Sequence, residues 1–595
     1  MSQSKPVLRR HPVFRALYIA LAGILFLTAA SSAQTAGAGS QQAPAQPKNL
    51  PELVDITAST GINFDHLSSP DQRYIVESMG GGVAILDYDQ DGWPDLYFTN
   101  AQSVDMALAG KKARSVLYHN NHDGTFTDVT DKAGVGYPCW GMGASVGDYN
   151  NDAWPDLLVT CFGGVVLYKN NGDGTFTDVT KAAGLGSDKA WATGAVFGDY
   201  DGDGWSDLFV SHYVDLNLGD LPKFGSSKTC KYHEIEVQCG PRGLKGSPDN
   251  LYRNNHDGTF TDVSKQAGVD DDKRFFGLTA VWSDFNQDGR LDLFVANDSE
   301  PNYLYRNDGN GHFTDVAYQA GVAVSQDGQE QANMGVALGD YEHTGRFSIA
   351  VTHFSDEYAA LFRNDGAMNF TDVSYEAGIA HSTSSYVGWG DVFFDFDNDG
   401  WSDFFMVNGH VYPQVDTSDV GTRYREPKLL FLNQHNGKFA DISKQAGPAL
   451  QTPSVSRGVA MGDLFNDGVI DLVIENLQGN GIVLKPKGTS NHWISFELAG
   501  TQKNRLALNA RVRVTAAGMV QTGEILSGGS YLSQNDLRLH FGLGAADHAD
   551  KVEILWSDGT TETLANLACD HHYYVLQGKG IVPAEQNRPK LIKRP

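Results

Sequence analysis

Aspartates recur at one spacing along most of this chain, and carboxylates at such a spacing can bind a metal ion. Residues 87–95 read Asp-Tyr-Asp-Gln-Asp-Gly-Trp-Pro-Asp, with carboxylates at places 1, 3, 5 and 9 and glycine at place 6. The frame begins again, complete or altered, at Asp148, Asp199, Asp284, Asp340, Asp395 and Asp463. Seven copies of one acidic loop indicate a repeat architecture with a row of cation sites.

The composition of these loops fits calcium. Ca²⁺ needs several oxygen ligands at once, and three or four crowded carboxylates repel one another unless a cation lies between them. Carboxylates at four places and a backbone carbonyl near place 7 supply such oxygens, while glycine permits the sharp bend. We therefore predict Ca²⁺ as a cofactor in about five loops. The alternative is a set of Asp-rich turns whose carboxylates are satisfied by backbone N–H groups alone.

Five copies carry enough oxygen atoms to be metal sites. Those beginning at Asp87, Asp199 and Asp395 have all four carboxylates and the glycine. The copy at Asp148 has Ala153 where glycine is expected, which predicts weaker binding. The predicted ligands, with the place-7 residues that offer a carbonyl, are Asp87, Asp89, Asp91, Trp93, Asp95, Asp148, Asn150, Asp152, Asp156, Asp199, Asp201, Asp203, Trp205, Asp207, Asp284, Asn286, Asp288, Arg290, Asp292, Asp395, Asp397, Asp399, Trp401 and Asp403.

Two copies depart further from the pattern. In the copy at Asp340, Thr344 and Ser348 occupy ligand places, and this loop is expected to bind no metal. The copy at Asp463 has Phe465 at its third place, and its metal binding is left open.

Each loop belongs to a unit of four predicted strands. Residues 80–98 hold a Gly-rich apolar strand, the acidic loop and a second strand, and residues 117–129 hold a hairpin around Asp-Gly. Strands on both sides of the loop, and Phe98 where an EF-hand has Glu, argue against an EF-hand. Loop starts lie 51 to 85 residues apart, as in propeller blades with insertions. We predict an all-β fold, a seven-bladed β-propeller followed by a small β domain.

The two ends of the repeat array complement each other. Residues 53–62 contain the tail of the hairpin half without its start, whereas the last unit, near 481–484, has a start without that tail. Joined, they form one blade, which predicts that the N-terminal strand closes the ring and removes exposed sheet edges.

The chain divides into five predicted segments. They are a signal peptide at 1–33, a flexible spacer at 34–50, the propeller at 51–487, the small β domain at 488–580 and a disordered tail at 581–595. The alternative for the first segment is an uncleaved anchor. We expect an exported protein, periplasmic, at the cell surface or secreted, with no stable membrane span once the signal is cleaved.

Net charge and cysteines indicate which partners and which disulfides the chain can have. A formal net charge of −27 argues against nucleic acid and anionic membranes as partners. An exported chain can form disulfides, and the best predicted pair is Cys230–Cys239, inside an insertion at about 214–248. Cys139 with Cys161 is possible, although the register is poor. Five cysteines leave one thiol unpaired or intermolecular.

The loop and its blade resemble the FG-GAP/VCBS repeat of integrin-α-type propellers. Further stretches resemble a family of bacterial and animal proteins, the cartilage acidic protein type, in which an ASPIC/UnbV domain follows such a propeller. These stretches are Cys239-Gly-Pro-Arg-Gly-Leu244, Asn297-Asp-Ser-Glu-Pro-Asn-Tyr-Leu304, Ala332-Asn-Met-Gly335 and Asn408-Gly-His-Val-Tyr-Pro413. The resemblance covers roughly residues 50–580.

The segment after Lys487 resembles the ASPIC/UnbV module itself. The matching runs are 504–511, 528–534, 539–544 and 556–559. Asn509 stands where that pattern has glycine, which puts the local turn in doubt. The resemblance implies no established chemistry for this module.

The function we expect is an exported, calcium-binding scaffold for binding or adhesion, with a protein or glycan ligand at the loops between blades. The alternative is an extracellular polysaccharide hydrolase or lyase built on the propeller, for which His410, Tyr412, His353 and His381 are candidates. The chain shows no nucleophile elbow, phosphate-binding glycine loop or zinc signature, so we do not expect an enzyme. The oligomeric state is not predicted.

Overall fold

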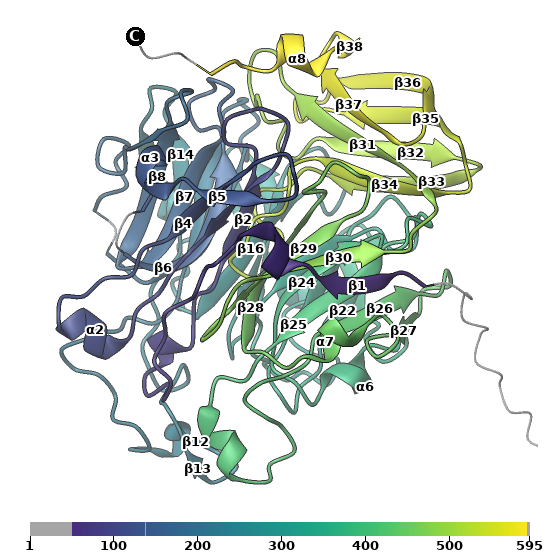
Figure 1. Ribbon diagram of the computed structural model, residues 1–595. Helices are drawn as coiled ribbons and strands as arrows, with labels where there is room; N and C mark the ends of the chain where they lie inside the picture. Colours follow the sequence, from purple (N-terminus) through teal and green to yellow (C-terminus); the bar gives the residue numbers. More distant parts are fainter. Residues whose placement is uncertain (1–49, 137–138, 188, 592–595) are drawn as a thin grey trace, which may run out of the picture. The chain divides into compact units, whose positions relative to one another are not determined.

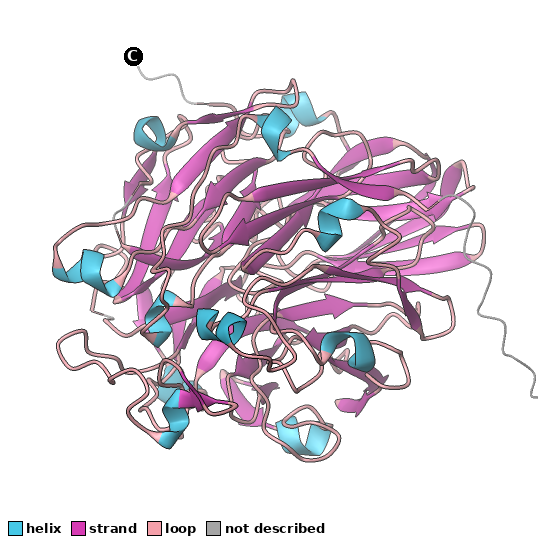
Figure 2. Cartoon of the chain, turned by 60° about the horizontal axis from the view of Figure 1, so that its bottom comes forward, coloured by secondary structure: helices cyan, strands magenta, loops and turns pink. Residues whose placement is uncertain are grey.

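The computed structural model describes residues 50–136, 139–187 and 189–591, and these belong to one compact unit. The predicted signal peptide and nearly all of the predicted spacer lie outside the described residues. Strands dominate the chain, and the helices are short (Figures 1 and 2). The fold is all-β, as predicted.

Residues 52–487 form seven four-stranded antiparallel sheets. Their strands, sheet by sheet, are β2 (Val83–Leu86), β3 (Asp95–Phe98), β4 (Val116–Asn120) and β5 (Phe126–Asp128); β6 (Trp140–Gly147), β7 (Asp156–Phe162), β8 (Gly164–Asn170) and β9 (Phe176–Asp178); β10 (Ala192–Gly198), β11 (Asp207–His212), β14 (Asn250–Asn254) and β15 (Phe260–Asp262); β16 (Gly277–Ser283), β17 (Asp292–Asn297), β18 (Tyr303–Gly309) and β19 (His312–Asp315); β20 (Val336–Gly339), β21 (Ser348–Val351), β22 (Ala360–Gly366) and β23 (Asn369–Asp372); β24 (Gly388–Phe394), β25 (Asp403–Asn408), β26 (Leu429–Asn433) and β27 (Phe439–Asp441); and β28 (Ser456–Gly462), β29 (Asp471–Asn476), β30 (Ile482–Lys487) and β1 (Glu52–Asp55).

The first strands of these sheets contact one another in a closed cycle. In chain order, each of β2, β6, β10, β16, β20, β24 and β28 contacts the next, and β28 contacts β2. Strand β1 completes the last sheet by pairing with β30, with Glu52 opposite Lys487. The predicted closure by the N-terminal strand is therefore found, and the cycle is consistent with seven blades.

Short helices lie in the connections between strands. They are α1 (Thr57–Thr60), α2 (Val104–Leu108), α3 (Thr130–Ala133), α4 (Ser264–Ala267), α5 (Ala317–Ala320), α6 (Ala380–Thr383), α7 (Pro448–Gln451) and α8 (Ala584–Asn587), with 3-10 turns η1 (Ile75–Glu77), η2 (Lys228–Cys230) and η3 (Pro413–Thr417). Within the described ranges, no helix has the length and apolar character needed to span a bilayer.

The C-terminal module consists of two further four-stranded sheets. One contains β34 (Leu539–Gly544), β31 (His492–Ala499), β37 (His571–Leu576) and β38 (Gly580–Ile581), and the other β33 (Met519–Glu524), β32 (Arg511–Ala516), β35 (His548–Leu555) and β36 (Thr561–Ala568). Apolar side chains such as Phe496, Val514 and Val552 are buried in its core. Asn509 adopts a left-handed φ of 61°, so it takes the conformation that glycine favours at this turn.

A loop of this module, residues 526–536, enters the centre of the propeller. The backbone N–H groups of Ala144 and Ile85 donate to the carbonyls of Leu532 (3.2 Å) and Gln534 (3.0 Å). Glycine is required where the loop passes, because a Cβ on Gly82 would lie 2.1 Å from the Leu532 carbonyl oxygen. The family-like run 528–534 thus fills the axis, and we call residues 526–536 the axial loop.

The predicted insertion lies between β11 and β14 and carries a small hairpin, β12 (Lys231–Tyr232) and β13 (Ile235–Glu236). The predicted Cys230–Cys239 disulfide is present, with an S–S distance of 2.01 Å. Figure 1 shows this hairpin at the bottom of the molecule and the C-terminal module at the top.

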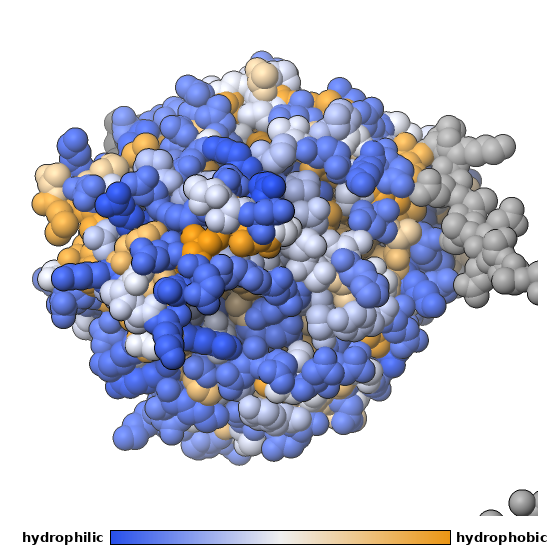
Figure 3. All heavy atoms as spheres, turned by 90° about the horizontal axis from the view of Figure 1, so that it is seen from below, coloured by the Kyte–Doolittle hydropathy of each residue, from blue (hydrophilic) through white to orange (hydrophobic). Residues whose placement is uncertain are grey.

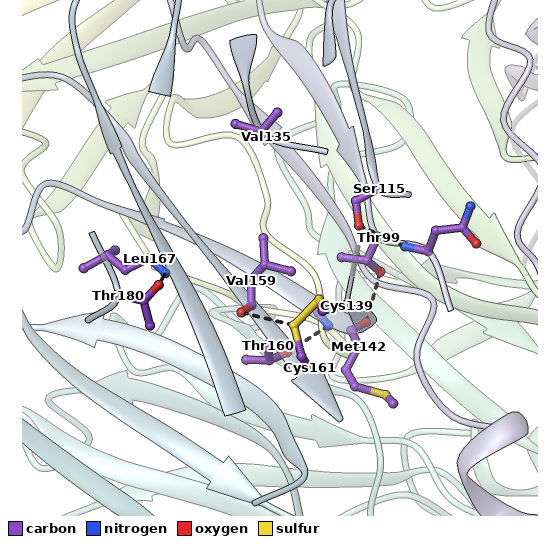
Figure 4. Close-up of a disulfide and its surroundings, with 12 residues drawn as sticks. Thr99, Ser115, Val135, Cys139, Met142, Val159, Thr160, Cys161, Leu167 and Thr180 are labelled. Atoms are coloured by element: carbon purple, nitrogen blue, oxygen red, sulfur yellow. Dashed lines mark hydrogen bonds between the residues drawn. A yellow bond between two sulfur atoms is a disulfide. The ribbon is translucent and has the colours of Figure 1, made fainter. Parts of the chain in front are cut away.

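A second disulfide joins Cys139, just before β6, to Cys161 in β7, with an S–S distance of 2.20 Å (Figure 4). The sequence left this pair open, and it forms although Gly141, not Cys139, is the register partner of Cys161. The pairing of β6 with β7 shifts between Gly141 and Ala144, and this irregularity brings the start of β6 beside Cys161. Cys569 is a free thiol.

Candidate metal centres

The acidic loops join the first and second strands of the blades. In the loop between β2 and β3, carboxylate oxygens of Asp87, Asp89 and Asp91 lie within 4.8 Å of one another. The N–H groups of Asp91 and Gly92 donate to Asp87 at 3.0 and 2.8 Å, which curls the loop around this side chain. Among the described residues, Oδ1 of Asp89 is buried without a hydrogen-bond partner. A bound cation would supply the interaction that this oxygen lacks.

The loop between β10 and β11 repeats this geometry. Carboxylate oxygens of Asp199, Asp201 and Asp203 again lie within 4.8 Å of one another. In this part of the described chain, Oδ1 of Asp199 is also buried without a hydrogen-bond partner. Burial, with a smaller contribution from the charges of Asp203 and Asp201, raises the pKa of Asp199 to about 7. The donor set and the orphaned oxygen both fit a hard cation.

The loop between β24 and β25 has the third complete set. Asp399 and Gly400 donate their N–H groups to Asp395 at 3.0 and 2.7 Å. Burial, and then the charges of Asp399 and Asp397, raise the pKa of Asp395 well above its ordinary value. Burial and Asp399 raise the pKa of Asp397 to about 6. Without a cation, this cluster is therefore held in a state that disfavours ionisation.

The ninth-place aspartates are held by backbone donors. Asp207 accepts the N–H of Tyr200 at 3.3 Å and that of Asn254 at 2.8 Å. The corresponding contacts are made by Asp95, Asp156, Asp292 and Asp403. At place 9, backbone N–H groups therefore satisfy the carboxylates, as the alternative to metal binding predicts. Each of these carboxylate oxygens still has a second lone pair that could bind a metal.

The three complete loops share a feature that the sequence analysis missed. Trp93 stacks on His122 with ring centroids 4.9 Å apart, and His122 Nε2 lies 2.6 Å from Oδ2 of Asp91. The same trio is formed by Trp205, His256 and Asp203 and by Trp401, His435 and Asp399. The histidine fixes the fifth-place carboxylate, and its sequence signal is a His at the hairpin turn opposite a loop with Trp at place 7.

Two loops of the predicted set carry a basic side chain at the fifth-place carboxylate. Lys169 Nζ lies 3.6 Å from Asp152, and Arg290 lies 2.5 Å from Asp288. Ala153 has a left-handed φ of 72°, where glycine is favoured. Lys169 and Arg290 therefore compensate part of the negative charge that a metal ion would otherwise neutralise in these two loops.

The seventh loop is neutralised by the C-terminal module. His572 Nε2 lies 3.4 Å from Oδ2 of Asp463, and Arg538 donates to the Asp463 carbonyl at 2.6 Å. Burial alone would raise the pKa of Asp463, but the hydrogen bond from His572 and the charge of Arg538 lower it to about 2. Protein cations therefore stand beside this carboxylate.

The C-terminal module contacts the acidic loops of several blades. Lys503 donates to the Asp203 carbonyl. Further hydrogen bonds to loop oxygens run from Asn504 N to Gly204 O (3.0 Å), Arg511 Nη2 to Asp284 O (2.7 Å), Asn491 Nδ2 to Asp397 O (2.9 Å) and Gly544 N to Asn398 O (2.8 Å). The candidate metal sites therefore lie between the propeller and this module.

A second set of missed residues links neighbouring blades. Asn254, buried on β14, donates from Nδ2 to Tyr149 O in the preceding blade (2.7 Å) and to Ser206 O in its own blade (3.0 Å). The equivalent residues are Asn120, Asn170, Asn307, Asn364 and Asn433. Their signal is an Asn at or near the end of the third strand in six of the seven units, and we call the six residues the clasp asparagines.

Two of the three histidines considered for catalysis, His353 and His410, are buried, and His381 is exposed. His410 is fully buried, and burial lowers its pKa to about 3, so it is neutral. His410 Nδ1 accepts the Tyr412 N–H at 3.0 Å. Burial likewise lowers the pKa of His353 to about 4, and His381 packs edge-on against Tyr375.

Comparisons with known proteins agree with this architecture. A family model described as an FG-GAP-like repeat matches residues 87–159, 148–210, 284–351 and 395–474. A model described as ASPIC and UnbV matches residues 500–582. The chain therefore carries FG-GAP-like repeats followed by an ASPIC and UnbV domain.

Among individual proteins, the chain is similar to cartilage acidic protein 1. It is 28% identical to the Mus musculus protein over 307 residues, 50% of this chain and 44% of the relative. It is 27% identical to the Homo sapiens protein over 307 residues, 50% of this chain and 43% of the relative. The match thus spans less than half the length of these relatives. Neither the family descriptions nor these names describe a catalysed reaction.

A solved Agrocybe aegerita lectin, described as recognising non-reducing terminal N-acetylglucosamine, is a more distant match. It is 15% identical, covers 67% of this chain and 86% of its own, and aligns with a TM-score of 0.36. This likeness carries no argument about the ligand of the present chain.

Proposed function

We propose that this chain is an exported, calcium-dependent binding scaffold, in which Ca²⁺ bound by the acidic loops stabilises the blades beneath the C-terminal module. The observation that carries the proposal is the crowding of carboxylates in the Asp87 and Asp199 loops, each of which holds a buried oxygen without a hydrogen-bond partner among the described residues. In the Asp395 loop, the charges of Asp399 and Asp397 act on Asp395 in the same way. Ca²⁺ bound there would neutralise the clustered charge and fix the loop conformation.

Export is supported by the disulfides and by the N-terminal sequence. Two disulfides, Cys139–Cys161 and Cys230–Cys239, are stable in an oxidising compartment and rare in the cytosol. The apolar run before residue 33 has the pattern of a secretory signal. The similarity to cartilage acidic protein 1 supports the same assignment.

The ligand is proposed to be a protein or glycan, bound at the blade end opposite the C-terminal module. The module covers the acidic-loop end, so the connections at the other end are the free inter-blade surface. Figure 3 views the molecule from that end and shows a mainly hydrophilic face with scattered apolar areas. We propose binding and no catalysis.

Thermal melting of the full chain tests the metal assignment. A ligand that binds only the folded state raises stability, by about 2.7 kcal/mol at a concentration 100 times its Kd. We expect the midpoint to rise in millimolar Ca²⁺ and to fall when a chelator is added. Equal midpoints in Ca²⁺ and in chelator would contradict the proposal.

A further inference from the structure

The face opposite the C-terminal module contains a pocket of about 290 Å³. The four stretches that carry the family resemblance outside the repeats, 239–244, 297–304, 332–335 and 408–413, each contribute residues to its wall. They come from separate blades and from the disulfide-bonded insertion. Their convergence on one cavity indicates a binding site that the acidic loops do not explain.

Aromatic rings form much of the pocket wall. Tyr213, Tyr232, Phe354 and Tyr412 line it. The Tyr232 ring centroid lies 5.7 Å from that of Tyr412 and 5.9 Å from that of Phe354, so these three rings make a continuous apolar surface. Trp389 also lines the pocket, but the Arg457 guanidinium already covers one of its faces, 3.9 Å from the centroid.

Two carboxylates give the pocket its charge. Asp298 is 7% exposed and accepts hydrogen bonds from Tyr213 Oη and from Ser299 Oγ, the latter at 3.0 Å. Oε2 of Glu357 accepts the N–H groups of Ala332 (3.0 Å) and Phe354 (3.3 Å). These hydrogen bonds hold both carboxylate groups in position in the pocket wall.

The charge of these carboxylates is poorly compensated inside the pocket. Burial, with a contribution from Asp298, raises the pKa of Glu357 to about 7. Arg242 is the one basic residue among the described residues that line the pocket. Its charge lowers the pKa of both carboxylates, but this smaller effect is outweighed by burial, and its side chain is 56% exposed at the rim, 4.0 Å from Glu330. A cation in the pocket would therefore be favoured by both carboxylates.

We propose that this pocket binds a protonated alkylamine, either the side chain of a lysine on a partner protein or a free amine of the same chemistry. The aromatic rings would pack against the methylene groups and face the ammonium, and Asp298 and Glu357 would accept its hydrogen bonds. A neutral sugar would leave the two carboxylates uncompensated, and the small volume suits one side chain better than an oligosaccharide. The inference deepens the proposed scaffold function and rests on it.

Calorimetric titration of the full chain in millimolar Ca²⁺ tests this assignment. The probes are Nα-acetyl-lysine amide, its Nε-acetylated form, n-butylamine and the peptide Gly-Gly-Lys-Gly-Gly. We expect saturable binding of the lysine amide and at least about tenfold weaker binding of the uncharged Nε-acetyl form. Tighter binding of the peptide than of butylamine identifies a protein lysine as the source, and equal binding identifies a free amine.

Matched variants locate the binding. Asp298→Asn and Glu357→Gln keep the side-chain shapes and should each weaken lysine amide at least about tenfold. Asp419→Asn, an exposed carboxylate outside the pocket wall, should leave the affinity unchanged. Even if one variant fails to fold, comparing lysine amide with its Nε-acetylated form on the unaltered chain still tests whether binding requires the ammonium charge.

The proposal is overturned if lysine amide does not saturate, if its Nε-acetyl form binds equally, or if N-acetylglucosamine binds and the amines do not. Such a result leaves the metal assignment standing, because chelator melting reports on the acidic loops alone. Conversely, if the melting midpoint is unchanged by chelator and the amines still bind, the calcium proposal is contradicted and the amine-binding proposal is supported.

Discussion

At the residue scale, ionisation is controlled by burial and by what the protein places beside each carboxylate. Asp199 and Asp395 lie in clusters of like charge, and their pKa values rise. Asp463 has the same loop position, but His572 and Arg538 stand beside it, and its pKa falls to about 2. The first aspartate of the same loop motif therefore has a raised pKa where no protein cation lies beside it and a lowered pKa where His572 and Arg538 do. In the first case, an ion from solution would be needed to stabilise the carboxylate.

A buried glutamate far from the loops gives a pH test. Glu426 is 1% exposed, accepts hydrogen bonds from Thr422 Oγ (2.8 Å) and Val387 N (3.0 Å), and burial raises its pKa from 4.5 to about 8. The folded state therefore retains a proton that the unfolded state releases. Stability from this group is complete below pH 4.5 and is lost as the pH rises to about 8.

Glu426→Gln should mimic the protonated acid and abolish this loss. In chemical denaturation, we expect the variant to match the unaltered chain near pH 5 and to exceed it by an amount of a few kcal/mol near pH 8. Thr422→Val, which removes one hydrogen bond without removing a titrating group, serves as the control. A difference that is the same at pH 5 and pH 8 would contradict the assigned ionisation.

At the scale of elements, the blades are held together by polar contacts between loops as well as by apolar packing. Each clasp asparagine donates to the backbone of its own blade and of the preceding one, as Asn254 does with Ser206 and Tyr149. The donors and acceptors are buried, so removing the amide leaves carbonyl oxygens without partners.

Asn254→Ala should therefore destabilise the fold by about 2 kcal/mol. Asn255→Ala is the matched control, since Asn255 bonds only within its own hairpin, to Thr259 and Thr261, and should cost less than about 1 kcal/mol. Urea denaturation of both variants measures the difference. Equal losses would show that the contact between blades contributes nothing beyond a local turn.

The sequence predicted the elements well because their signals are local. The Asp87 loop, the hairpin at 117–129 and the Cys230–Cys239 pair each depend on residues close together in the chain. Side-chain contacts across long separations were missed, although the closure of the ring by the N-terminal strand was predicted. His122 lies 31 residues from Asp91, and Arg538 lies 75 residues from Asp463, so each contact is indicated only when two distant segments are compared with each other.

The Cys139–Cys161 pair was left open at the sequence level for a related reason. A regular antiparallel register does not bring these residues together, and the shift between Gly141 and Ala144 is not visible in a pattern of alternating residues.

At the scale of the whole molecule, the C-terminal module is part of the propeller's structure. Its axial loop bonds to inner strands, with Phe197 N donating to Ser527 Oγ at 3.1 Å and Asp391 N to Ser530 Oγ at 3.2 Å. Its basic side chains, including Lys503, meet carbonyls of the acidic loops. The two parts are therefore expected to unfold together.

Leu532→Asp should uncouple them. Leu532 is 4% exposed where the axial loop crosses the inner strands, and a charge there would be buried without a partner. We expect calorimetry to resolve two transitions and limited proteolysis to cut between residues 487 and 492. Leu555→Asp, at a position 43% exposed on the same module, should keep one transition. A single transition in both variants would show that the axial loop does not couple the module to the propeller.

The calcium content of the purified chain tests the central claim most directly. After dialysis against millimolar Ca²⁺ and rapid removal of free metal, elemental analysis should find at least three ions per chain, one for each loop with four carboxylates. Asp199→Asn should lower that number by one, and Asp340→Asn, in the loop with Thr344 at a ligand place, should not change it. A chain that retains no calcium under these conditions would contradict the account.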